Sequence, residues 1–130
     1  MTRDDVQRWL DRYVVAWMSY DPSAIGDLFT TDAEYRHHPW DDPVGGRDAI
    51  IEDWLNPAGD LANRDKPGSV EAHYACYTAD GDRAVALGDT TYRNLPDGTI
   101  TRHYDNVWLL EFAPDGRCCG FIEYYMRKKH

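Results

Sequence analysis

The side chains of this sequence whose types and settings suit proton-transfer chemistry are Tyr13, His37 and Glu123. His37 falls on the apolar face of a predicted strand, and histidine titrates near neutral pH, so it suits general acid or base chemistry. Tyr13 falls in the apolar stripe of a predicted helix, where a buried phenol needs a hydrogen-bond partner. A phenol donating to a developing oxyanion can lower a reaction barrier substantially. Each of the two can equally be a packed, hydrogen-bonded core residue.

Glu123 lies between Phe121 and Tyr125 on one face of the last predicted strand. Burying a carboxylate costs free energy unless the group is paired, or its pKa rises so that it stays protonated. Either outcome gives a useful acid–base group. The structural alternative is a carboxylate that pairs with an arginine or bonds to Tyr13 or His37.

Aromatic and amide side chains at strand and helix positions are candidates for the walls of a ligand cavity. They suit a flat, cyclic or aromatic molecule, although core packing is the better explanation for at least half of Trp17, Trp54, Trp108 and Tyr125. The candidates are Trp17, Trp54, Asn106, Trp108 and Tyr125. Arg102 and Tyr104 share the strand face of Trp108 and can supply a polar rim. The side that Asp89 faces stays open, because a one-residue change of register reverses every side chain.

Spacings typical of metal sites and of other catalytic classes do not occur in the sequence. There is no HxxxH, HxH or CxxC to gather metal ligands, and His37 and His38 are expected to face opposite ways, with His38 at the surface or an interface. No GxSxG motif marks a serine nucleophile, and Gly45-Gly46 is typical of a turn rather than of a phosphate-binding loop. We therefore expect neither a metal nor a cofactor.

Helices are predicted in the first half of the chain, and they must position Tyr13 and Trp54. Thr2 can cap a helix whose apolar stripe ends near Tyr20, and Asp21-Pro22 begins a short second helix. A third helix ends at Asn56-Pro57. A short strand is predicted over residues 33–38, and a long loop over 56–68.

The second half is predicted to be four consecutive strands, which must position Trp108 and Glu123. Asp-Gly turns separate these strands and are typical of hairpins, so the pattern predicts an antiparallel meander and an α+β domain. The strands cover residues 70–78, 83–93, 99–112 and 117–127. The strand around Trp108 is apolar on both faces. Trp108, Leu110 and Phe112 lie on one face, and Val107 and Leu109 lie on the other. One face can pack on the helices, and the other suggests a homodimer.

Composition excludes several classes of partner. The 130 residues carry a net charge of −9, which argues against nucleic acid and against anionic membrane surfaces. The sequence has an odd number of cysteines, which makes a poor disulfide framework: Cys76, Cys118 and Cys119. Neither a signal peptide nor a span of about 20 apolar residues is apparent. We expect a cytoplasmic protein with one domain over residues 1–130.

Three stretches resemble one known family. DRYVVAWMSYDPSAIGDLFTTDAEY looks like the opening of SnoaL-like proteins and of bacterial steroid Δ-isomerases, and HPWDDPVGGRDAIIEDWL looks like their loop into the third helix. YDNVWLLEFAPDGRCCGFIEYYM looks like the last hairpin of SnoaL-like members. The resemblance covers nearly the whole chain. It implies the nuclear transport factor 2-like fold, in which a curved antiparallel sheet wraps around N-terminal helices and a small-molecule pocket.

The same resemblance implies roles for individual residues. Tyr13 falls where those isomerases place an oxyanion-hole tyrosine, His37 where they place an aspartate base, and Trp108 where they place a protonated aspartate. Because two of the three differ, the resemblance does not imply steroid isomerisation. Three hypotheses follow. The chain is a cofactor-free acid–base isomerase, cyclase or dehydratase for a small hydrophobic molecule, a non-catalytic binder of such a molecule, or a dimeric structural module with a filled cavity.

Overall fold

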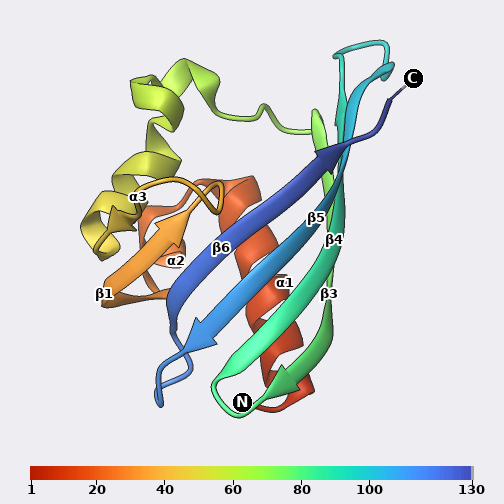
Figure 1. Ribbon diagram of the computed structural model, residues 1–130. Helices are drawn as coiled ribbons and strands as arrows, with labels where there is room; N and C mark the ends of the chain where they lie inside the picture. Colours follow the sequence, from red (N-terminus) through yellow and green to blue (C-terminus); the bar gives the residue numbers. More distant parts are fainter. Residues whose placement is uncertain (130) are drawn as a thin grey trace.

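A reciprocal pair of hydrogen bonds begins the N-terminal helix, α1 (Arg3–Ser19). The computed structural model describes residues 1–129 (Figure 1). The Asp5 backbone N–H donates to Thr2 Oγ1 and the Thr2 backbone N–H donates to Asp5 Oδ2, each at 3.0 Å. This capping box satisfies two amide groups that have no partner inside the helix. It fixes the start of the element that carries Tyr13 and Trp17.

The remaining elements follow the predicted order of helices and then strands. The helices are α2 (Pro22–Gly26) and α3 (Arg47–Leu55), followed by two short 3-10 turns, η1 (Pro57–Gly59) and η2 (Leu61–Asn63). The strands are β1 (Phe29–Arg36), β2 (Val44–Gly45), β3 (Val70–Asp80), β4 (Arg83–Arg93), β5 (Ile100–Phe112) and β6 (Cys118–Arg127). The long loop predicted over 56–68 therefore contains η1 and η2.

The six strands form one mixed sheet in the order β2-β1-β6-β5-β4-β3. Strands β3 to β6 pair antiparallel in sequence, each joined to the next at one of the three Asp-Gly turns. The predicted meander and the α+β class are confirmed. The sheet is curved and open, and α1 lies across its concave face behind β4 to β6 in Figure 1.

Strand β1 differs from its prediction. It begins four residues earlier, at Phe29, and pairs in parallel with β6, where Tyr35 lies opposite Phe121. It ends at Arg36, so His37 and His38 lie in the bend that follows and not on the strand. The strand alternation expected for the two histidines therefore does not apply. Pro39 contributes to this early end because it has no N–H to donate to a ladder.

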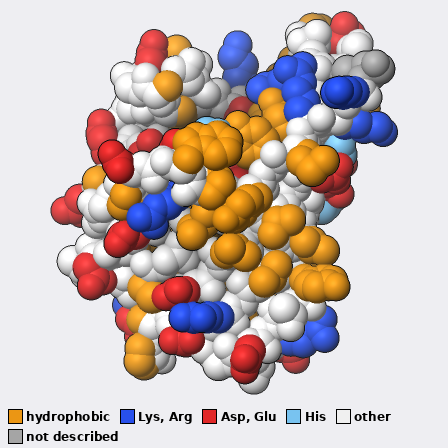
Figure 2. Space-filling model, in the orientation of Figure 1, with side chains coloured by type: hydrophobic (Ala, Val, Ile, Leu, Met, Phe, Trp, Pro, Cys, Tyr) orange, Lys and Arg blue, Asp and Glu red, His pale blue; other side chains and the backbone are white. Residues whose placement is uncertain are grey.

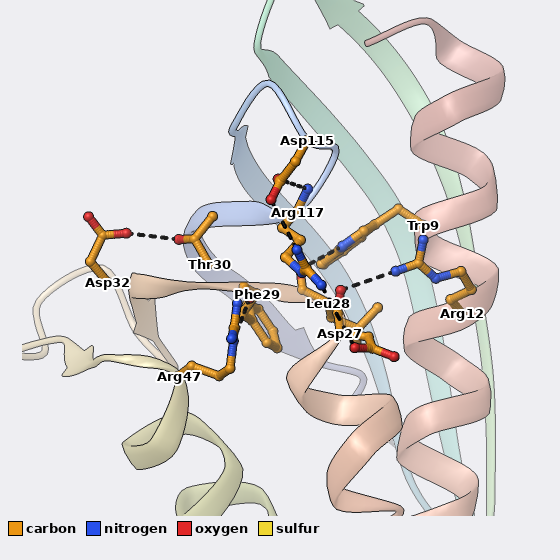
Figure 3. A network of polar contacts seen from close by, with 10 residues as sticks. All are labelled: Trp9, Arg12, Asp27, Leu28, Phe29, Thr30, Asp32, Arg47, Asp115 and Arg117. Carbon is orange, nitrogen blue, oxygen red and sulfur yellow. Dashed lines mark hydrogen bonds and ion pairs between the residues drawn. The ribbon is translucent and has the colours of Figure 1, made fainter.

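Polar contacts connect the helices to the sheet at the turn between β5 and β6 (Figure 3). Trp9 Nε1 on α1 donates to the backbone carbonyl of Leu28 at 3.0 Å. Arg117, in the turn between β5 and β6, pairs with Asp115 at 3.1 Å and with Asp27 at 3.9 Å. These contacts join α1, the end of α2 and the last hairpin, which holds the helices against the concave face.

Apolar side chains also cover the outer face of the sheet, on which no helix within residues 1–129 packs. Val85, Leu109 and Ile122 lie side by side across β4, β5 and β6, and the next row is Leu87, Val107 and Tyr124. Figure 2 shows these strands from outside, with a hydrophobic patch at the centre of the view. We call these six residues the outer patch.

Asp89, whose side the sequence left open, lies on the outer face. It is opposite Asp105 on β5, while its neighbour Thr90 is buried on the concave side. No helix within residues 1–129 is long and apolar enough to cross a membrane.

Candidate functional site

A cavity of about 410 Å³ lies between the helices and the concave face of the sheet. This volume is in the range of small-molecule sites, and Tyr and Trp make up most of the wall. The candidate residues named from the sequence line it, together with the two rim candidates Arg102 and Tyr104: Tyr13, Trp17, His37, Trp54, Asn106, Trp108, Glu123 and Tyr125. Because the space is open, the tryptophans do not plug it, which argues against a purely structural module.

Glu123 presents one carboxylate oxygen to this cavity. Its Oε2 accepts hydrogen bonds from Trp108 Nε1 at 2.7 Å and from Asn106 Nδ2 at 2.9 Å. Its Oε1 has no hydrogen-bond partner within residues 1–129 and is not sealed from solvent. Burial raises the pKa of Glu123 above its ordinary value, although the bonds from Trp108 and Asn106 oppose this rise. The carboxyl group is therefore fixed at one oxygen and free to exchange a proton at the other.

A chain of hydroxyl groups fixes which way the Asn106 amide points. Tyr74 Oη lies 3.0 Å from Thr90 Oγ1, and Thr90 Oγ1 donates to Asn106 Oδ1 at 3.1 Å. With its oxygen occupied by Thr90, Asn106 can only donate its NH₂ group to Glu123. The position of the Glu123 carboxylate is thus set by three strands, β4, β5 and β6.

Two buried phenols form a second polar group in the cavity. Tyr13 Oη on α1 lies 2.7 Å from Tyr35 Oη on β1, and both side chains are almost fully buried. Burial raises the pKa of both phenols well above the ordinary tyrosine value, so both stay protonated at neutral pH. One proton joins the two oxygens and the other stays available, so the pair can donate one hydrogen bond to a ligand oxygen.

Packing holds the Tyr13 ring against the strand that carries Trp108. The ring centroids of Tyr13 and Trp108 are 4.4 Å apart, and Trp54 lies 4.7 Å away on another side. Because Trp108 also bonds Glu123, the phenol pair and the carboxylate meet at one indole ring. Donor and acid–base group therefore share the same end of the cavity.

His37 forms the third polar group through an aspartate on α3. His37 Nε2 lies 2.7 Å from Asp53 Oδ2, and His37 Nδ1 has no hydrogen-bond partner within residues 1–129. The bond to Asp53 raises the pKa of His37, against the opposing effect of burial. An aspartate that accepts from one ring nitrogen leaves the other nitrogen to handle a proton. His37 itself is half-exposed at the cavity edge.

The sequence hypotheses named other partners for these groups. Glu123 bonds Trp108 and Asn106 and not an arginine, Tyr13 or His37. His38 was expected at the surface or an interface; its side chain is partly exposed, and its Nε2 lies 2.8 Å from the Tyr125 hydroxyl. The chain turns after Arg36, so strand alternation does not decide where the two histidines point; His37 lines the cavity and His38 does not.

Several cavity residues were missed at the sequence level. Tyr35 had a usable signal, because alternation placed it on the same face as His37. Asp53 and Asp65 had none, since their partners come from distant segments. Asp65 Oδ2 accepts from Trp17 Nε1 at 2.9 Å, and the Asp65 backbone N–H donates to the Tyr20 hydroxyl at 2.9 Å. These bonds hold the segment after η2 against the end of α1.

A second hollow, of about 510 Å³, lies beside the network of Figure 3. Arg8 pairs there with Asp5 and Arg117 with Asp115 and Asp27, while Arg12 donates to the backbone carbonyl of Asp27. It therefore offers a ligand less than the first cavity. Within residues 1–129 no group of three or more His, Cys, Asp or Glu side chains is placed to hold a metal ion.

Comparison with known proteins agrees with this fold. The epoxide hydrolase/cyclase-like enzyme SalBIII, described for its role in pyran ring formation in the polyether salinomycin, has a similar structure. The two structures align with a TM-score of 0.70 and 17% sequence identity. The alignment covers 97% of this chain and 95% of that chain, which shows a shared fold. The expected nuclear transport factor 2-like fold is confirmed. No curated protein sequence matches the chain significantly. The sequence model of the SnoaL-like domain matches residues 6–121, so the chain belongs to the SnoaL-like family.

Proposed function

We propose that this protein is a cofactor-free acid–base enzyme acting on a small hydrophobic molecule. The observation that carries the proposal is the Glu123 carboxyl group, anchored at Oε2 by Trp108 and Asn106 and open to the cavity at Oε1. Its raised pKa brings the ionised and protonated forms closer in free energy near neutral pH. A non-catalytic binding site needs no such arrangement.

Proton transfer at Glu123 would be coupled to hydrogen bonding at the phenols. Ionised Glu123 removes a proton from the carbon beside a substrate carbonyl, and the Tyr13–Tyr35 pair donates to the oxygen as negative charge develops there. The proton then returns from Glu123, or from protonated His37, to a different substrate atom. Isomerisation, aldol-type ring closure and dehydration all use this sequence.

A proton-exchange assay tests this without knowledge of the natural substrate. The bicyclic ketone 2-tetralone is dissolved in D₂O with the protein, and loss of its α-hydrogen signals is followed by NMR. We expect the wild-type protein to accelerate exchange, and Glu123→Gln to reduce the protein-dependent rate about a hundredfold or more, because the amide cannot accept the proton. Tyr13→Phe should reduce the rate as well, through loss of a donor.

The matched control is Glu111→Gln, which changes an exposed carboxylate on the same strand as Trp108 but outside the cavity. It should leave exchange unchanged. Exchange equal to that of a protein-free blank, or undiminished in Glu123→Gln, would contradict the catalytic proposal and leave a binding protein.

We also propose that two copies of the chain pair through the outer patch. Its members Leu87, Leu109 and Tyr124 remain 41%, 39% and 43% exposed, although each lies in the middle of the sheet. An apolar face of this kind, bordered by charged side chains, is typical of an interface.

The three cysteines are free, which suits the reducing cytoplasm expected from the sequence.

A further inference from the structure

Arg102 is the one lysine or arginine that lines the cavity within the described part of the chain. Its guanidinium carbon lies 4.2 Å from the centre of the Tyr92 ring, and Nη1 donates to the Tyr104 hydroxyl at 3.3 Å. No carboxylate within residues 1–129 lies within 4.0 Å of it. The two tyrosines hold the guanidinium in place and leave most of its N–H donors without a partner.

Strand register places Arg102 at the far end of the cavity from the reacting groups. Arg102 is opposite Tyr92, whereas Trp108, which bonds Glu123, is opposite Ala86. The six residue steps from Arg102 to Trp108 correspond to about 20 Å of strand. Both side chains share the concave face, so one ligand can span them. Arg127 adds a second positive charge at this end, since it pairs with Tyr104 across β5 and β6.

Of the three acidic residues of the cavity, Asp53 and Asp65 already have partners near them, and Glu123 keeps one free oxygen at the opposite end from Arg102. Asp53 bonds His37, and Asp65 accepts from Trp17. A cationic ligand would suit the aromatic walls, but at this end of the cavity it would meet the positive charge of Arg102, and it could reach Asp53 or Asp65 only by displacing their partners. Figure 2 shows lysine and arginine side chains gathered at the end of the sheet nearest the C-terminus. In a chain of net charge −9 this basic end attracts anions to the opening.

We propose that the ligand of this cavity is a hydrophobic carboxylic acid whose carboxylate pairs with Arg102. Its apolar body lies along the aromatic walls, and its other end carries the oxygen that accepts from the Tyr13–Tyr35 pair. Placement of the reacting end rests on the proposed function, whereas the pairing with Arg102 does not. A planar carboxylate matches the fork of N–H donors on a guanidinium.

Two matched probes test the pairing by titration calorimetry. One is 3-(6-hydroxynaphthalen-2-yl)propanoic acid, and the other is its primary amide, which has the same shape without the charge. We expect the acid to bind the wild-type protein about five- to tenfold more tightly. Arg102→Met should remove this preference while leaving the amide affinity within about twofold. High salt should also reduce the difference in affinity between the acid and the amide, because it screens the charge of Arg102.

The control variant is Arg83→Met, which removes an exposed arginine at the opposite end of β4 and should preserve the preference. Equal affinity for acid and amide in the wild-type protein, a preference that survives Arg102→Met, or no binding of either probe would each overturn the proposal. The tetralone exchange assay uses an uncharged ketone that does not depend on Arg102. Failure of the carboxylate pairing can therefore be told apart from failure of the catalytic proposal.

Discussion

At Glu123, burial and hydrogen bonding act on one carboxyl group in opposite directions. Desolvation favours the protonated form, while the donors Trp108 and Asn106 favour the ionised form. The donors occupy only one oxygen, so they orient the group without blocking proton exchange at the other. This balance explains how a carboxylate can remain reactive in an aromatic cavity. A salt bridge to an arginine would have fixed it in the ionised state.

His37 depends on Asp53 for its protonation state, which yields a prediction. Asp53→Asn removes the carboxylate whose hydrogen bond raises the pKa of His37, so burial then dominates and the pKa should fall below its value in the wild-type protein. The His37 ring-proton shift, followed by NMR across pH 5–9, reports this change. Asp48→Asn on the exposed start of α3 is the control and should not alter the titration.

The same pair sets a dependence of stability on pH. The pKa of His37 in the folded protein lies above its ordinary value of 6.5, so its contribution is complete below that pH and is lost as pH rises through the raised pKa. Unfolding by urea should therefore show a larger difference between wild type and Asp53→Asn at pH 6 than at pH 9. A difference that does not change with pH would contradict the assigned pairing.

Among the strands, Gly88 on β4 permits a close contact that shapes the cavity wall. A Cβ atom at this position would lie 2.1 Å from Tyr74 Cδ1 and 2.6 Å from the His73 carbonyl oxygen. Tyr74 in turn stacks on Trp108 with ring centroids 3.8 Å apart. Gly88→Ala should lower the free energy of unfolding by about 1–3 kcal/mol, measured by urea denaturation, because Tyr74 must move.

Gly120→Ala on β6 is the matched control for this contact. Its Cβ would meet the Glu111 side chain at 3.5 Å, an ordinary contact, so stability should change little. Displacing Tyr74 should also loosen the indole that anchors Glu123, so Gly88→Ala should slow tetralone exchange more than Gly120→Ala does. Equal stability of the two variants would show that β3 can shift to accommodate the methyl group.

Local signals explain which elements the sequence could predict. Asp-Gly turns and alternating apolar residues specify neighbouring strands, so β3 to β6 were predicted closely. The parallel pairing of β1 with β6 joins residues such as Tyr35 and Phe121, which are far apart in the chain. No local pattern encodes this pairing, so the start of β1 at Phe29 could not be predicted, whereas its end at Arg36 had a local signal in Pro39.

The candidate site divides in the same way. Tyr13, Glu123 and the tryptophans sit on elements with clear periodicity, so their location in one cavity followed from the fold. The hydrogen-bond partners of the site residues could not be predicted in this way. The Tyr13–Tyr35 bond joins α1 to β1, and the His37–Asp53 bond joins a bend to α3. Such contacts depend on tertiary geometry, which strand or helix alternation alone cannot supply.

On the scale of the whole molecule, its two faces and its net charge predict how copies of the chain associate. The outer patch favours pairing through the sheets, while a charge of −9 on each copy opposes it, so screening by salt should strengthen the dimer. Sedimentation equilibrium should give twice the monomer mass of 15.0 kDa for the wild-type protein. Leu109→Glu should give the monomer mass, because burying an unpaired carboxylate in the interface is costly. Val15→Glu, on the exposed side of α1, is the control and should remain dimeric. A monomeric wild type, or a dimer that survives Leu109→Glu, would contradict pairing through the outer patch.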